Sequence, residues 1–191
     1  SNIKIVDNLI EDFIYNPEFL REKHAEEDFI NANMIILGGD KDNQEKVKNL
    51  YENNSLCKTT NYVFTDKITA SLIKYSINSF LASKVTFFNE LKDLFNSSGA
   101  TEDWDIFTDI LAMDERIGNS HMNVPGHDGR LGFGGACFTK DTAALIKYSQ
   151  TLEKEFSLLK QVVEINNNIR SKYDQVDKRE KDQNVNYDFD N

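Results

Sequence analysis

Residues 66–96 constrain the fold most, because their apolar side chains recur at the spacing of one long helix. Asp66 or the threonine before it can cap the start, and Asn96–Gly99 is a typical end. About 30 residues at 1.5 Å each give a helix about 45 Å long, longer than a small domain is wide. We therefore expect packing partners on more than one side, with a second subunit as one candidate. The apolar positions are Ile68, Leu72, Ile73, Ile77, Phe80, Leu81, Val85, Phe88, Leu91 and Phe95.

The residues before this helix predict α/β structure. Asp12–Tyr15, Met34–Leu37 and Asn61–Phe64 are short apolar runs expected to be strands, and Asp42–Tyr51 is an amphipathic helix. The first strand should end at Asn16–Pro17, because proline lacks the backbone donor that a ladder needs. These strands are too few for a complete doubly wound sheet, so they predict the trailing edge of one.

The rest of the chain predicts mainly helix. A second helix should run from Trp104 to Leu111, and a loop from Met113 to Gly135 holds six of the nine glycines. After Asp141 the chain is predicted to be helical again, with Leu152, Phe156, Leu159 and Val163 on one stripe.

The expected fold class is therefore mixed α/β, mainly α. We expect the trailing strands of a Rossmann-like sheet in residues 1–64 and a helical central domain built on the long helix in residues 65–176. Residues 177–191 are charged and rich in asparagine, which indicates a frayed or docked tail.

Composition narrows the function. A net charge of −10 argues against nucleic acid and against an anionic membrane surface. Cys57 and Cys137 follow no disulfide or zinc spacing, and His24, His121 and His127 follow no metal motif, so we expect no metal site. The sequence contains neither a signal peptide nor an apolar run of membrane-spanning length, which predicts a cytoplasmic protein.

The glycine-rich run Gly132–Asp141 carries the clearest chemical signal. If a helix starts near Phe138, Cys137 lies at its N-terminus, where the helix dipole and nearby Lys140 would favour the thiolate. Asp141 follows one turn later and can act as a base on water. The alternative is a small buried cysteine packed in a turn, since free cysteine behaves like a small hydrophobic residue.

Four motifs occur along the chain, in this order: Asn16–Glu22, Lys74–Ala82, Met113–Gly118 and Gly132–Asp141. Their order resembles that of the UDP-glucose/GDP-mannose dehydrogenase family, with the UDP-glucose branch nearer, over about residues 12–170. The resemblance implies an NAD-binding Rossmann domain, a helical dimerisation domain and a third, nucleotide-binding domain. This chain would hold the end of the first and all of the second. Since no G-x-G-x-x-G loop follows a strand here, the NAD loop is expected upstream.

The resemblance implies oxidation of the C6 alcohol of UDP-glucose, or a related sugar nucleotide, to a carboxylate. Two hydrides pass to NAD, through a cysteine thiohemiacetal and a thioester. Cys137 would be the nucleophile, with Asp141 beside it and Glu18 as the acid/base group. Lys74 and Asn78, four residues apart on one helix face, would stabilise the developing oxyanion. The alternative for Lys74 is a solvated helix lysine.

Binding roles follow from the same resemblance. Arg116 would reach the sugar nucleotide bound in a partner subunit. Glu22 would contact substrate and cofactor, although a carboxylate favoured by a helix N-terminus is an equal alternative. The aromatic members of the set could instead be core residues. The other expected substrate contacts are Phe19, Leu20, Phe133, Gly134, Phe138 and Lys140, of which Gly134 and Lys140 would also contact the cofactor.

Two classes of function remain open from the sequence. One is an NAD-dependent nucleotide-sugar 6-dehydrogenase that forms a homodimer through residues 66–96, acting on UDP-glucose or, alternatively, on GDP-mannose. The other is a dimerisation and sugar-nucleotide-binding module without turnover, because the dinucleotide fingerprint is absent from the sequence.

Overall fold

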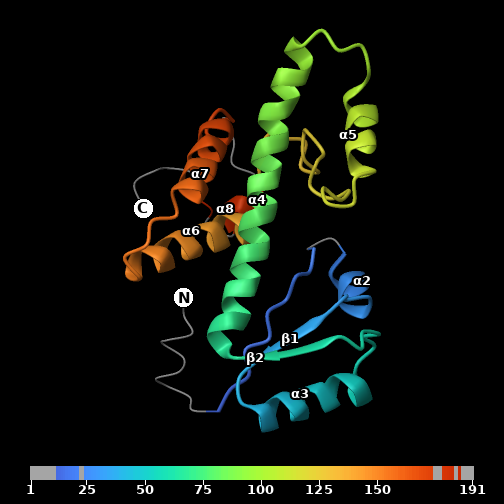
Figure 1. Ribbon diagram of the computed structural model, residues 1–191, viewed down its shortest axis with the longest axis vertical. Coiled ribbons are helices and arrows are strands. Elements are labelled where there is room, and N and C mark those ends of the chain that lie inside the picture. The colour runs from blue at the N-terminus through green and yellow to red at the C-terminus, as the bar shows by residue number, and fades with distance from the viewer. Residues whose placement is uncertain (1–11, 22–23, 174–177, 183–184, 186–191) are drawn as a thin grey trace. The chain divides into compact units, whose positions relative to one another are not determined.

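The structure, a computed structural model, describes residues 12–21, 24–173, 178–182 and 185. The chain forms two compact units, residues 1–76 and 77–191. The longest element, α4 (Lys67–Ser97), begins in the first unit and continues in the second (Figure 1). The long helix predicted for residues 66–96 is thus confirmed.

The first unit contains a two-stranded parallel sheet. Strand β1 (Ile35–Gly38) pairs with β2 (Tyr62–Thr65), and helix α3 (Lys41–Asn54) connects them. All four residues of β1 are buried, as the unbroken apolar run predicts. These two strands and the helix between them confirm the predicted α/β arrangement. Helix α2 (Ala25–Ile30) precedes β1.

A buried glutamine makes hydrogen bonds to the backbone at the carboxyl ends of both strands. The Nε2 group of Gln44, on α3, donates hydrogen bonds to the backbone oxygens of Leu37, Gly39 and Thr65 at 2.7–3.0 Å. Because backbone acceptors at strand ends must be satisfied when they are buried, this side chain fixes α3 against the sheet.

The strand predicted for Asp12–Tyr15 is wrong in extent. Only Tyr15 joins the sheet, through an isolated antiparallel bridge to Gly38 with two backbone hydrogen bonds of 2.8 Å. The side chain of the next residue, Asn16, donates a hydrogen bond to the backbone oxygen of Ile36 at 2.9 Å. In this described segment the backbone pairing is therefore confined to Tyr15, and a side-chain contact follows it.

The second unit is helical. It contains the rest of α4, then α5 (Trp104–Ala112), α6 (Ala136–Thr151), α7 (Ser157–Arg170) and the short α8 (Lys178–Asp182). Helix α5 lies along α4 (Figure 1), where Phe88, Trp104, Met122 and Val124 form one apolar core. The predicted helix at 104–111 is confirmed.

The continuous helix predicted through residues 152–163 is wrong. Helix α6 ends at Thr151, and α7 begins only at Ser157. Glu153 takes a left-handed conformation, with φ of 55°, and the amide of Lys154 bonds back to the carbonyl of Ser149 at 3.0 Å. A left-handed residue with such a backbone hydrogen bond commonly ends a helix, and it is usually glycine. Because this segment has no glycine, its sequence did not indicate that the helix ends here.

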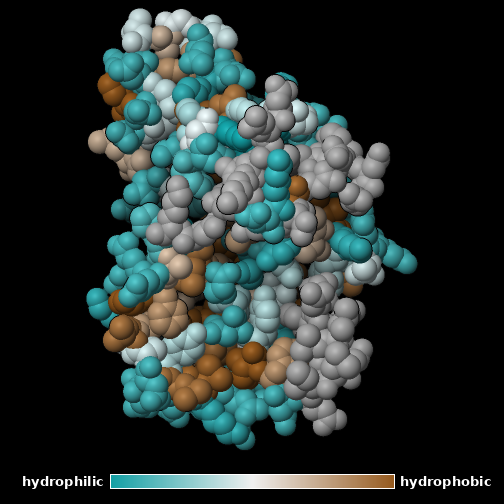
Figure 2. Space-filling view, turned by 180° about the vertical axis from the view of Figure 1, so that it is seen from behind, coloured by the Kyte–Doolittle hydropathy of each residue, from teal (hydrophilic) through white to brown (hydrophobic). Residues whose placement is uncertain are grey.

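Several apolar side chains remain on the surface. On the face seen in Figure 2 they lie in patches among hydrophilic residues. Along α4, the side chains of Phe80, Phe87 and Leu94 are 69%, 59% and 65% exposed. Of the helices described, none is both long and apolar enough to span a bilayer.

Candidate functional site

Cys137 lies in the first turn of α6. The helix begins at Ala136, after Gly135 in a left-handed conformation with φ of 78°. The thiol-bearing residue is exposed, so the alternative of a small buried cysteine does not hold. An anion at this end of a helix is stabilised by the partial positive charge of the free backbone N–H groups.

Asp141, one turn after Cys137, is buried to 1% exposure. Its Oδ2 accepts a hydrogen bond from Nδ2 of Asn78, on α4, at 2.6 Å. The other oxygen, Oδ1, lies 3.6 Å from Nζ of Lys140 and accepts no hydrogen bond from any described residue. The carboxylate is therefore oriented through one oxygen, while the other is buried beside the ammonium of Lys140 with unused hydrogen-bonding capacity.

A second polar cluster lies within the first unit. Nζ of Lys74 donates to the backbone oxygen of Glu18 at 2.7 Å and to its Oε1 at 2.9 Å. The backbone N–H of Leu20 donates to Oε2 of the same carboxylate at 2.8 Å, and the ring of Phe19 lies 5.9 Å from Nζ. Lys74 is 8% exposed, which excludes the solvated helix lysine.

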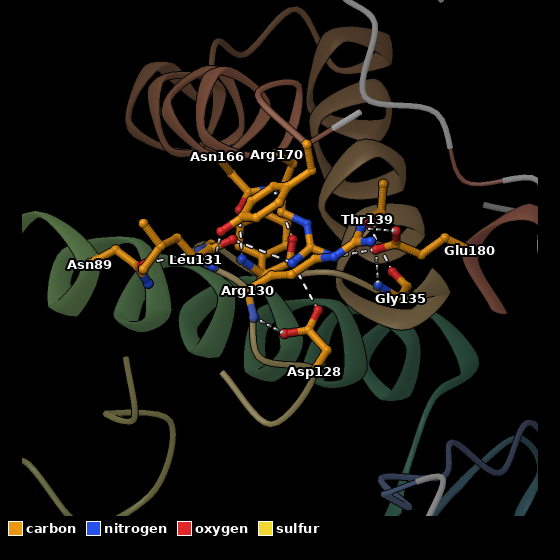
Figure 3. Close-up of polar contacts among 12 residues, drawn as sticks. Asn89, Asp128, Arg130, Leu131, Gly135, Thr139, Asn166, Arg170 and Glu180 are labelled. Carbon is orange, nitrogen blue, oxygen red and sulfur yellow. Dashed lines mark hydrogen bonds and ion pairs between the residues drawn. The ribbon is translucent and has the colours of Figure 1, made fainter. Parts of the chain in front are cut away.

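The glycine-rich loop before Cys137 is held by buried side chains (Figure 3). Oδ1 of Asn89, from α4, accepts from the N–H of Gly132 at 2.9 Å. Asn166, from α7, makes two bonds to Phe133, accepting from its N–H at 2.7 Å and donating to its carbonyl at 3.1 Å. The hydroxyl of Tyr173 accepts from the N–H of Leu131 at 2.8 Å.

Two glycines are required by these close contacts. A Cβ on Gly132, whose φ is 74°, would lie 2.6 Å from Oδ1 of Asn166. A Cβ on Gly134 would lie 2.5 Å from Oε1 of Glu180. The glycines therefore allow the side chains of Asn166 and Glu180 to approach the backbone of this run closely.

Buried ion pairs continue this network. Arg170, whose side chain is 1% exposed, binds Asp128 through Nη1 at 2.8 Å and Glu180 through Nη2 at 2.5 Å. Burial alone would raise the pKa of Asp128, but hydrogen bonds from Arg170 and from the N–H of Arg130, with the nearby positive charges, outweigh it and lower that pKa. The loop is thereby tied to α7 and α8.

Arg116 lies in an exposed loop, with 89% of its side chain accessible, and its guanidinium binds Asp114. This hydrogen bond lowers the pKa of Asp114. Lys84, on α4, fixes the neighbouring loop residues by donating to the carbonyls of Ile117 at 2.9 Å and Gly118 at 3.2 Å. Burial lowers the pKa of Lys84.

The comparison with protein families decides the identity of this domain. The UDP-glucose/GDP-mannose dehydrogenase family, central domain, matches residues 68–168. The chain belongs to this family. It is 37% identical over 153 residues to a UDP-glucose 6-dehydrogenase of Rickettsia felis, covering 79% of this chain and 32% of the relative. A UDP-glucose 6-dehydrogenase of Rhizobium meliloti is 40% identical over 162 residues, covering 81% of this chain and 34% of the relative.

A solved structure supports the same assignment. The UDP-glucose dehydrogenase of Pyrobaculum islandicum matches with a TM-score of 0.69 and 33% identity, over 80% of this chain and 33% of that one. The chain thus spans about a third of the length of the relatives it matches.

The residues predicted from the family resemblance fall into two groups. Glu18, Phe19, Leu20 and Lys74 meet within the first unit. Asn78, Asp141 and Lys140 meet within the second, with Cys137 on the same helix as Asp141. Arg116 contacts neither group in the described residues, and Glu22 lies outside them.

The predicted aromatic residues of the second unit take part in packing, and their substrate contacts stay predictions. Phe133 is 4% exposed and lies in a core with Ala82 and Val162. Phe138 packs against this core, with its ring centroid 6.1 Å from that of Phe133. Phe133 therefore supports the loop from inside.

Sequence reasoning missed the polar residues that hold the family's glycine-rich loop: Asn89, Asn166, Arg170 and Glu180. Asn89 and Asn166 are buried residues that lie beside apolar positions of their helices, such as Val85 and Val162. A polar residue in that position is a usable signal, because a buried amide must have partners. In the described part of the chain, no three His, Cys, Asp or Glu side chains are grouped as a metal site would need.

Proposed function

We propose that this chain is the thiol-bearing part of an NAD-dependent nucleotide-sugar 6-dehydrogenase that converts UDP-glucose to UDP-glucuronate. The observation that carries the proposal is an exposed Cys137 in the first turn of α6, with the buried carboxylate of Asp141 one turn later. Family membership and relatives named UDP-glucose 6-dehydrogenase support the substrate class.

The role proposed for Cys137 is nucleophilic. Its thiolate adds to the C6 aldehyde, and the new C–S bond gives a thiohemiacetal whose further two-electron oxidation leaves a thioester. Water then adds to the thioester carbon, a proton passes to a carboxylate, and the C–S bond breaks to release the sugar acid and the thiolate. Asp141 fits the proton-accepting step, because its Oδ1 accepts no hydrogen bond from the described residues.

Lys74 and Glu18 receive the roles that the resemblance implies. A buried ammonium that donates to a carboxylate and a carbonyl has a fixed position, which suits stabilisation of a developing oxyanion. The carboxylate of Glu18 is 56% exposed and can exchange protons with water, as a general acid/base group must. Asn78 orients Asp141.

The N-terminus of α3, the helix that follows β1, does not fit the pyrophosphate of NAD. After β1 the chain passes through Gly39 to Asp40, whose carboxylate accepts from the N–H of Asn43 at 2.9 Å and so occupies the N-terminus of α3. A dinucleotide would need that helix end free. NAD is proposed as the hydride acceptor of the protein, with its pyrophosphate held elsewhere. Cofactor contacts at Glu22, Gly134 and Lys140 stay predictions.

A homodimer through α4 is proposed from its exposed apolar face. Phe80, Phe87 and Leu94 recur every seven residues, so they form one stripe along the helix. Isolated apolar side chains need no explanation, but a row of them along one helix favours a partner surface. A second copy supplies a matching stripe through two-fold symmetry.

The alternative function is a sugar-nucleotide-binding and dimerisation module without turnover, favoured by the missing fit to NAD. The test measures NADH formation from UDP-glucose and from GDP-mannose, with this chain alone and with a Rossmann segment added upstream. UDP-glucose binding is measured in parallel by calorimetry. NADH formation from UDP-glucose in either preparation supports the dehydrogenase, whereas binding without NADH in both supports the module.

A further inference from the structure

Glu180 is a buried carboxylate in a segment that the family match does not reach. The match ends at residue 168, and residues 177–191 were expected to form a frayed or docked tail. Yet the side chain of Glu180, on α8, is 1% exposed. A carboxylate loses its hydration on burial, so it stays buried only where ion pairs and hydrogen bonds replace the water.

One partner of Glu180, the backbone of Gly135, lies at the start of the helix that carries Cys137. Oε1 accepts from Nη2 of Arg170 at 2.5 Å and from the backbone N–H of Gly135 at 3.3 Å. Oε2 lies 3.7 Å from Nη1 of Arg130. One carboxylate thus joins α7, the glycine-rich loop and the residue that caps α6 (Figure 3).

The fit around this carboxylate is close. The carboxylate fits beside Gly134 only because glycine has no side chain, since a Cβ there would lie 2.5 Å from Oε1. Arg170 is in turn held by Asp128, so the guanidinium cannot follow Glu180 if the carboxylate moves. The contact therefore fixes a backbone position two residues before the thiol.

We propose that Glu180 is a positioning residue for Cys137: its carboxylate fixes the backbone of Gly135 against Arg170 and so sets where α6 and its thiol begin. The catalytic consequence rests on the dehydrogenase proposed above. The positioning itself does not, because it can be measured without substrate.

The negative charge of Glu180 should also affect the reactivity of Cys137. Glu180 places a negative charge at the N-terminus of α6, where the helix dipole favours anions. Removing that charge leaves the guanidinium of Arg170 less compensated, and the electrostatic potential at the start of α6 becomes more positive. Alkylation of Cys137 at neutral pH should therefore become roughly two- to fivefold faster in Glu180→Gln, the usual size of one charge at a helix end.

The experiment uses the 191-residue chain as parent, Glu180→Gln, Glu180→Asp and a control, Glu164→Gln, which changes an exposed glutamate on α7. Hydrogen exchange is followed in the peptide that contains residues 132–137. Iodoacetamide labelling of Cys137 is compared by mass spectrometry with that of Cys57, the internal reference in the first unit. Circular dichroism establishes that each variant is folded.

Both changes at Glu180 should speed exchange at residues 132–137 about tenfold or more, because each weakens a buried hydrogen-bonded contact. Aspartate keeps the charge but is one methylene shorter. The Glu180→Asp variant therefore shows the effect of losing the contact with Gly135 without the effect of losing the charge. If Glu180→Gln does not fold, the aspartate variant carries the test. Parental exchange in a folded variant would overturn the proposal. Faster exchange in both variants together with a parental Cys137-to-Cys57 labelling ratio in Glu180→Gln would overturn it too, because Glu180 would then be structural only.

Discussion

Replacing Asn166 with alanine should destabilise the second unit strongly. Asn166 is fully buried, and its amide makes two hydrogen bonds to the backbone of Phe133, at 2.7 and 3.1 Å. Alanine leaves the N–H and the carbonyl of Phe133 buried without these partners. Each unsatisfied group costs roughly 1–3 kcal/mol, so the variant should lose about 2–6 kcal/mol of unfolding free energy. This is a large fraction of the stability of an ordinary domain.

The sequence provides a matched control in the same helix. Asn168 is exposed, two residues further along α7, so Asn168→Ala makes the same chemical change without a buried partner. We expect its unfolding free energy to change by no more than about 0.5 kcal/mol, as for other surface substitutions.

Urea unfolding followed by tryptophan fluorescence measures the difference. Trp104 is the single tryptophan and lies in the apolar core of the second unit, so its signal reports that unit. The two variants should differ in unfolding midpoint at similar slope. Equal midpoints for Asn166→Ala and Asn168→Ala would refute the claim that Asn166 holds the loop.

Three further predictions concern stability and assembly. Gly132→Ala should cost about 1–3 kcal/mol more than Gly99→Ala in urea unfolding, because both have positive φ but only Gly132 has a close neighbour; equal losses would contradict that contact. The pKa of Asp128 is lowered in the folded state, so its contribution to stability is complete above about pH 4 and is lost as the pH falls through the folded pKa. In Asp128→Asn the unfolding free energy should therefore fall less steeply with decreasing pH. An unchanged slope would count against the ion pair of Asp128 with Arg170. Phe87→Glu should turn a dimer into a monomer in sedimentation, since burying one phenylalanine contributes roughly 1.5–3 kcal/mol; a parent that is monomeric at every concentration would remove the basis for the dimer.

The long helix and the parallel strands were predictable because periodicity reports burial directly. The apolar spacing of α4 is typical of a long helix, and the short apolar run of β1, which ends at two glycines, is typical of a buried strand. The break after Thr151 was not predictable, because Glu153 adopts the left-handed conformation without a glycine. Backbone hydrogen bonds end the helix there, and they do not require a residue type that the sequence would reveal.

The candidate site was predictable where it depends on helical spacing. Cys137 and Asp141 lie one turn apart, as the sequence indicated. The support of the loop was hidden, because it comes from residues far along the chain: Asn89 lies 43 residues before Gly132, and Glu180 lies 45 after Gly135. A single sequence shows which residues are polar, but not which backbone group each one will satisfy.

The central claim is that Cys137 is the nucleophile of a two-step oxidation. The direct measurement is NADH formation from UDP-glucose by Cys137→Ala, in the preparation in which the parent is active, with UDP-glucose binding followed by calorimetry. Cys57→Ala serves as the control. We expect Cys137→Ala to bind UDP-glucose and to fail to complete the oxidation, while Cys57→Ala turns over like the parent. Parental turnover in Cys137→Ala would contradict it.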